Sequence, residues 1–122
     1  MIIDTSAIIS LAFNEPTADW VEQQIARADR VLMSTVNLAE TLIVLRARKS
    51  CVYDQLRSDL FNAGFQFVAP DAAQAEIAAN ARSMFPLNFG DCFAYALAKS
   101  TGLPLLTLDA DFRKTDILVV SP

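Results

Sequence analysis

The chain of 122 residues has no histidine at all, and it has only two cysteines, three glycines and five prolines. The absence of histidine excludes the Ser-His-Asp and Cys-His catalytic systems and removes imidazole as a metal ligand. Cys51 and Cys92 lack Cys-x-x-Cys spacing, so an ordinary zinc site is excluded, and this cysteine usage is typical of a reducing cytoplasm. Any chemistry must therefore come from carboxylates, hydroxyls, lysine or a hard metal ion.

Long hydrophobic runs are also absent. No apolar stretch approaches the roughly 18 residues that are needed to span a bilayer. The first residues, MIIDTSAIISLAF, contain the acid Asp4 and no basic group, which argues against a secretory signal peptide. We therefore expect a soluble, cytoplasmic protein with no membrane partner.

The composition predicts one folded domain over residues 1–122. Hydrophobic residues make up 53% of the chain and charged residues 20%, a balance that can fill a core and differs from that of disordered chains. The net charge of −4 argues against a broad phosphate-binding surface. If four of the 14 acidic residues shared one pocket, the other 10 would balance the 10 basic residues, and the excess charge would belong to that pocket.

Short apolar runs alternate with amphipathic stretches, and turn residues separate them. We predict strands at residues 1–3, 31–33, 65–69, 103–108 and 117–120, helices at residues 5–13, 17–28, 35–49, 52–62, 71–86 and 91–101, and a loop at residues 87–90. This alternation predicts an α/β fold with a central, mostly parallel sheet of four or five short strands that is covered by helices.

Two acids directly follow predicted strands. Asp4 follows the first strand and Asp109 a later one, and the hydroxyl residues Thr5 and Ser6 come next to Asp4. Because ligands of open α/β sheets bind at the carboxyl ends of the strands, we expect both carboxylates on one rim. Each acid also has an ordinary explanation, since Asp4 is a good helix N-cap and Asp109 and Asp111 suit a turn.

Glu40 and Asp91 belong to unusually apolar segments. Glu40 lies within LAETLIVL, and Asp91 is followed by CFAYALA, so both carboxylates should be partly buried. A salt bridge for Glu40 and an N-cap for Asp91 are the ordinary explanations. Four acids so placed, without matching basic residues nearby in sequence, would repel one another unless a cation joined them. Oxygen ligands select Mg²⁺ or Mn²⁺, which commonly bind phosphate-bearing substrates.

Four segments carry a resemblance to a known family: MIIDTSAII, STVNLAETL, LNFGDCFAYALAK and LLTLDADFRKTDI. In this order and spacing they resemble the motifs of the PIN-domain ribonucleases, most closely the VapC-type toxins of bacterial toxin-antitoxin pairs, over nearly the whole chain. The resemblance implies a three-layer PIN-like fold and Mg²⁺- or Mn²⁺-dependent hydrolysis of RNA phosphodiesters. It further implies a cognate antitoxin, which would cover or fill the acidic pocket, and a homodimer.

The resemblance also assigns roles to residues of this chain. The catalytic and metal-binding acids would be Asp4, Glu40, Asp91 and one acid of the stretch from Asp109 to Asp111. We place Asp109 first and treat Asp111 as an outer aid to the metal. Thr5 or Ser6 would support these acids with a hydroxyl group, and Asp116 is expected to be structural. One bound ion or two remain equally compatible with this set.

Basic residues near the motifs are candidates for RNA contacts: Arg46, Arg48, Lys49 and Arg113, with Lys99 and Lys114 as further options. For most of them the ordinary explanation is a solvated surface or a charge at a helix C-terminus. Apolar side chains on two helices are candidates for an interface, with core placement as the alternative: Trp20, Val21, Ile25, Leu42 and Leu45.

Two other functions compete with the nuclease. The main alternative is a non-catalytic module of the same fold that docks to a protein partner and uses the acids only as helix caps. A haloacid-type phosphatase is disfavoured, because such enzymes need an Asp-x-Asp pair and Ser6 occupies the place of the second aspartate.

Overall fold

The structure, a computed structural model, describes all 122 residues and confirms the predicted α/β class. Its sheet has five parallel strands in the order β3-β2-β1-β4-β5. The strands are short: β1 (Ile2–Ile3), β2 (Leu32–Ser34), β3 (Gln66–Val68), β4 (Leu105–Leu106) and β5 (Val119–Val120). Because every pairing is parallel, the carboxyl ends of all five strands lie at one edge of the sheet.

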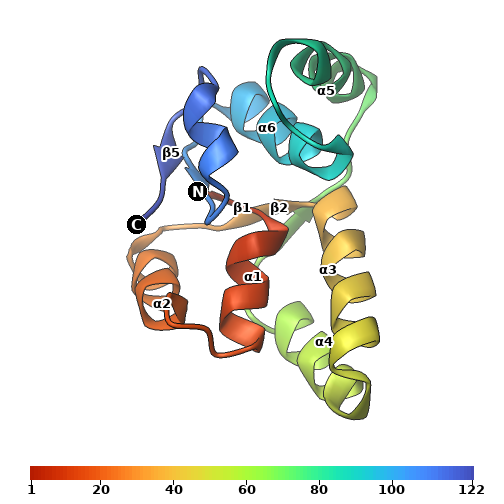
Figure 1. Cartoon of the computed structure of the whole chain (residues 1–122), viewed down its shortest axis with the longest axis vertical. Coiled ribbons are helices and arrows are strands. Elements are labelled where there is room, and N and C mark those ends of the chain that lie inside the picture. Colours follow the sequence, from red (N-terminus) through yellow and green to blue (C-terminus); the bar gives the residue numbers. More distant parts are fainter.

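Helices cover both faces of this sheet and complete three layers. They are α1 (Thr5–Ala12), α2 (Ala18–Arg27), α3 (Thr35–Arg48), α4 (Tyr53–Phe61), α5 (Ala72–Met84) and α6 (Phe89–Thr101), with short 3₁₀ helices η1 (Ser50–Val52) and η2 (Ala110–Lys114). Figure 1 shows α5 and α6 on one side of the strands and α1, α2 and α4 on the other, with α3 reaching along the sheet edge.

Successive strand residues point to opposite faces, so the sheet divides the core into two clusters. Ile2 and Leu105 belong to the cluster under α5 and α6. Ile3 and Leu106, their neighbours in the sequence, belong to the cluster under α1 and α2. The apolar pairs in β1 and β4 thereby fix the sheet between two helical layers, and the residues that follow these strands emerge at the same edge.

The structure corrects two details of the predicted elements. Helix α6 begins at Phe89 within the predicted loop, because Asn88 is its N-cap and accepts a hydrogen bond from the backbone N–H of Asp91 (2.8 Å). The 3₁₀ helix η2 was not predicted; it forms because Asp109 caps it by accepting from the N–H of Asp111 (2.9 Å). Gly102 ends α6 with a left-handed backbone (φ 70°), as expected for a C-terminal glycine.

Two of the five apolar residues considered for an interface are core residues. Val21 and Leu45 are 0% and 1% exposed, respectively. Trp20, Ile25 and Leu42 are partly buried and pack against the core cluster under α1 and α2. No helix of the chain is both long enough and apolar enough to cross a bilayer.

Candidate active site

Asp4 is both the N-cap of α1 and a buried site residue, at 3% exposure. Its Oδ1 accepts from Ser6 Oγ (2.6 Å) and the N–H of Ala7 (3.2 Å), and its Oδ2 accepts from Thr107 Oγ1 (2.5 Å). Burial raises the pKa of Asp4 from 3.8 to about 6, although the Ser6, Thr107 and Ala7 hydrogen bonds act against this shift. The N-cap role considered from the sequence is confirmed, and the role of the same carboxylate in catalysis stays a prediction.

Glu40 is a half-buried residue of α3, and its side chain lies next to the first residue of α1. Its Oε1 accepts from the side-chain amide of Asn37 (2.8 Å) and from Thr5 Oγ1 (3.2 Å). No basic side chain pairs with it, because the two salt bridges in the chain involve other acids. The salt bridge considered from the sequence is therefore absent, and polar neutral groups hold the carboxylate instead.

Asp91 occupies the first turn of α6 and forms a capping box with Asn88. Its Oδ2 accepts from the backbone N–H of Asn88 (3.1 Å), so Asp91 is the third residue of the helix and not its N-cap. Burial, which is the largest cause, raises its pKa from 3.8 to about 6, and the negative charges of Asp109, Asp4 and Glu40 add to the increase. These four acids therefore share one electrostatic site.

The two aspartates at the end of β4 differ in their surroundings. Asp109 contributes its charge to the raised pKa values of Asp4 and Asp91. Asp111 forms an ion pair with Lys114 (Nζ to Oδ1, 3.1 Å), which offsets its charge. These surroundings favour Asp109 as the fourth acid, and the roles of both aspartates stay predictions.

The donor set suits a hard cation. Glu40, Asp91 and Asp109 each have one carboxylate oxygen that accepts a hydrogen bond, whereas no protein group donates to the other oxygen. Oxygen donors that carry excess negative charge are typical of Mg²⁺ and Mn²⁺ sites. As the side chains stand, no three acids lie close enough to ligate one ion together.

The raised pKa values predict how the stability of the metal-free protein depends on pH. Folded Asp4 and Asp91 keep their protons up to about pH 6, whereas the unfolded chain releases them near 3.8. The folded state thus binds more protons in this window, and the stability contributed below 3.8 is lost as the pH rises through about 6.

We expect the unfolding midpoint, measured in EDTA, to fall across that window because of these two groups. The double variant Asp4→Asn, Asp91→Asn should show a flatter profile. Identical profiles for the variant and the unmodified chain would contradict the prediction.

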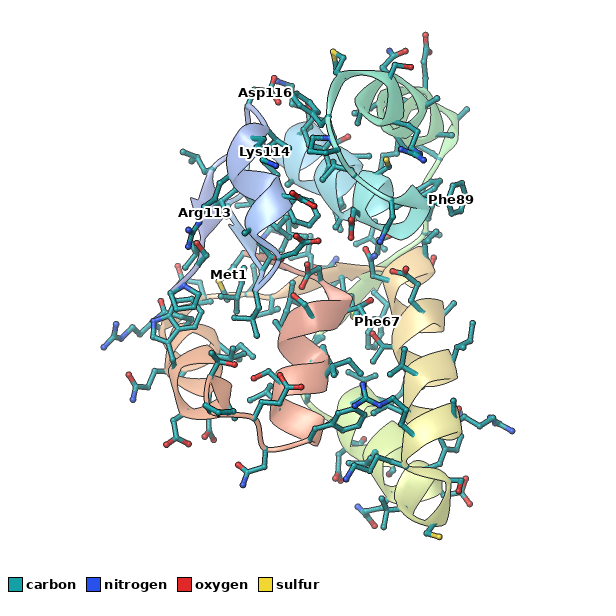
Figure 2. The ribbon with its side chains drawn as sticks, viewed as in Figure 1. Met1, Phe67, Phe89, Arg113, Lys114 and Asp116 are labelled. Atoms are coloured by element: carbon teal, nitrogen blue, oxygen red, sulfur yellow. The ribbon has the colours of Figure 1, made fainter.

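The basic residues proposed for RNA contacts are not gathered around the acids. Arg46 lies over the ring of Tyr53, and Arg48 and Lys49 lie over the ring of Phe13, at the C-terminal end of α3. Arg113 donates to Ser121 Oγ and to the carbonyl of Pro122 at the outer edge beside β5 (Figure 2). Their contacts with RNA stay a prediction.

Asp116 has the structural surroundings that were expected of it. It accepts hydrogen bonds from the buried Tyr95 (2.6 Å) and from Lys99 (2.8 Å). These contacts join α6 to the segment before β5 and leave Asp116 outside the group of four acids.

Three residues of this site were not singled out from the sequence. Thr107 is fully buried; it donates to Asp4 and accepts from the N–H of Asp109 (3.0 Å), so it links two of the acids. Asn37 donates to Glu40, and Gly90 leaves the space beside Glu40 free of a side chain. Thr107 and Asn37 are polar residues within the quoted segments, which was the available signal. The contacts of Thr107 with Asp4 and of Gly90 with Glu40, however, join segments far apart in the sequence.

Comparisons with known proteins show what the chain is similar to. The sequence model of the PIN domain family matches residues 1–118. A protein named ribonuclease VapC from Mycolicibacterium smegmatis is 40% identical over 128 residues, which cover 98% of this chain and 99% of that protein.

Two solved structures share the fold. One is VapC20 of Mycobacterium tuberculosis, described as a Sarcin-Ricin loop cleaving toxin, with a TM-score of 0.83 and 17% identity, covering 99% of this chain and 98% of that one. The other is VapBC2 of Rickettsia felis bound to a promoter DNA fragment, with a TM-score of 0.79 and 14% identity, covering 99% of this chain and 97% of that one.

Proposed function

The chain belongs to the PIN domain family and, within it, to the VapC ribonucleases, and from this premise we propose that it is an endoribonuclease that needs Mg²⁺ or Mn²⁺ to hydrolyse RNA phosphodiesters. In this role it is the toxin of a toxin-antitoxin pair. The observation that carries the metal requirement is the group of four acids at the sheet edge, three of which have a carboxylate oxygen that accepts no hydrogen bond.

Glu40, Asp91, Asp109 and Asp4 are the residues that would hold the ion. When bound, Mg²⁺ or Mn²⁺ lowers the pKa of a water molecule and neutralises charge on the scissile phosphate. The protein itself orients the carboxylate oxygens. Hydrogen bonds from Thr107 and Ser6 hold the carboxylate of Asp4, and the capping box holds that of Asp91. Because the chain has no histidine, proton transfer would fall to water or to these carboxylates.

The test is incubation of the purified chain with total bacterial RNA, followed by mapping of the new RNA ends. We expect defined cuts in Mg²⁺ or Mn²⁺, no cuts in EDTA, and recovery when the metal is restored. Cleavage that continues in EDTA would contradict the metal requirement. A well-folded chain that binds no Mn²⁺ in calorimetry and cuts no RNA would favour the non-catalytic docking module.

We also propose a cognate antitoxin as protein partner. Similar folds include that of a toxin-antitoxin complex from Klebsiella pneumoniae. An apolar cavity of about 270 Å³ between α1, α3 and α4, lined almost entirely by hydrophobic residues, offers an apolar segment of the antitoxin a place apart from the acids. Failure of the protein encoded beside this chain to bind it or inhibit it would remove the proposal.

A homodimer is proposed from large apolar side chains that are exposed on three helices. Ile43, Met84 and Phe89 are 69%, 61% and 72% exposed, on α3, at the end of α5 and at the start of α6. Figure 2 shows Phe89 projecting outward from the start of α6. Large apolar groups on the surface of a small chain favour an interface. A monomer in sedimentation at micromolar concentration would contradict the dimer.

A further inference from the structure

The starts of α3 and α6 lie side by side (Figure 1), and one side chain near the acids joins them. Asn37, on α3, is 1% exposed. Its Nδ2 donates to Glu40 Oε1 (2.8 Å) and to the backbone carbonyl of Gly90 (3.0 Å). Because both partners can only accept, the orientation of the amide is fixed. Asn37 therefore ties Glu40 to the helix that carries Asp91.

The remaining atom of this amide has no partner. Asn37 Oδ1 is buried and accepts no hydrogen bond. An unpaired buried acceptor is unfavourable for folding, so asparagine is a costly choice for stability at this position. Its two donated hydrogen bonds, both made at the acidic site, are what distinguish it from an apolar residue of similar size.

Gly90 contributes to the same arrangement by lacking a side chain. A Cβ at position 90 would overlap the carboxylate of Glu40, whose three terminal atoms are its nearest neighbours. The backbone of Gly90 is not left-handed, since only Gly64 and Gly102 have positive φ among the glycines. The position therefore calls for glycine because of the space that Glu40 occupies and not because of backbone strain.

We infer that Asn37 and Gly90 are positioning residues that seat Glu40 against the first turn of α6, with Oε1 held and Oε2 left free for the cation. The link to catalysis rests on the proposed function, whereas the positioning of Glu40 by Asn37 and Gly90 does not. Loss of a partner that orients a metal ligand typically lowers metal affinity or activity by about 10- to 100-fold.

The packing of Glu40 against Gly90 is tested first, without metal or RNA, by measuring unfolding midpoints of single and double variants in EDTA. Alanine stabilises a helix more than glycine does. In a Glu40→Ala background, where the overlap is removed, we expect Gly90→Ala to raise the unfolding midpoint by about 3 to 5 °C. With Glu40 present, the same substitution should leave the midpoint unchanged or lower it. Equal shifts of the unfolding midpoint in the two backgrounds would overturn the inference that Glu40 packs against Gly90. If Gly90→Ala folds only in the Glu40→Ala background, that outcome supports it.

The second test measures Mn²⁺ binding by calorimetry. We expect Asn37→Ala to weaken Mn²⁺ binding about 10-fold or more. RNA cleavage by this variant should fall at limiting Mn²⁺ and recover substantially at high Mn²⁺, a pattern that general damage to the fold would not give. Asn62→Ala is the matched control, because Asn62 is an exposed asparagine whose side chain donates only to Ser58.

The two proposals fail in different ways. Unchanged Mn²⁺ affinity and cleavage in Asn37→Ala would overturn the role of Asn37. If the unmodified chain binds no Mn²⁺ and cuts no RNA, the proposed function fails, while the stability cycle between positions 40 and 90 still decides whether Gly90 seats Glu40.

Discussion

Asp4→Asn and Asp91→Asn are each expected to lower RNA cleavage by at least about 100-fold, because even an outer partner of a metal ligand contributes about 10- to 100-fold. Each substitution keeps the volume of the side chain and removes its charge. Cleavage rates at fixed Mg²⁺ concentration measure the effect. Rates for both variants that match those of the unmodified chain would contradict the assignment of these acids.

The same substitutions should not destabilise the fold. Asparagine caps helices as well as aspartate, and in Asp91→Asn the side-chain oxygen of the new amide can still accept from the N–H of Asn88. Burial raises the pKa of Asp4 from 3.8 to about 6, which at about 1.4 kcal/mol per pKa unit disfavours the charged, folded form by about 3 kcal/mol at neutral pH. We therefore expect the free energy of unfolding in EDTA to be equal or higher for Asp4→Asn.

A matched control separates loss of charge at the site from loss of charge in general. Asp19 is an exposed aspartate on α2 and forms no salt bridge. Asp19→Asn should leave RNA cleavage unchanged. It should also leave the unfolding free energy within about 0.5 kcal/mol, as is usual for surface substitutions.

Asp109→Asn is expected to lower cleavage by at least about 100-fold, whereas Asp111→Asn should change it only a few-fold. The charge of Asp109 acts on Asp4 and Asp91, and one of its oxygens accepts no hydrogen bond. Asp111 is paired with Lys114. The pair of variants is informative because the two aspartates are separated by a single residue and differ mainly in what surrounds them.

Measurements of cleavage and of Mn²⁺ affinity on both variants check this prediction. A larger loss for Asp111→Asn than for Asp109→Asn would reverse the assignment. Lys114→Ala offers a further comparison, since it frees the carboxylate of Asp111 without changing either acid. Cleavage should be close to that of the unmodified chain if Asp111 does not bind the ion.

Local sequence patterns were sufficient to predict the five strands and six helices, although not η2 or the exact start of α6. They also placed Asp4 and Asp109 near the ends of strands, because side-chain periodicity and helix capping depend on neighbours a few residues apart. The absence of histidine confined the possible chemistry to carboxylates, hydroxyls, lysine or a hard metal ion. The resemblance of four segments predicted the family that the comparisons confirm.

Only the tertiary structure decided which of these groups meet. Thr107 bonds Asp4 across 103 positions, and Asn37 bonds Gly90 across 53. These contacts depend on β1 lying between β2 and β4 in the sheet, an order set by the long-range packing of two cores and not by local propensity. For the same reason the sequence could not tell that Val21 and Leu45 are core. The burial of Asp4 and its hydrogen bond from Thr107 depend on segments far apart in the chain, so they became defined only when the sheet assembled.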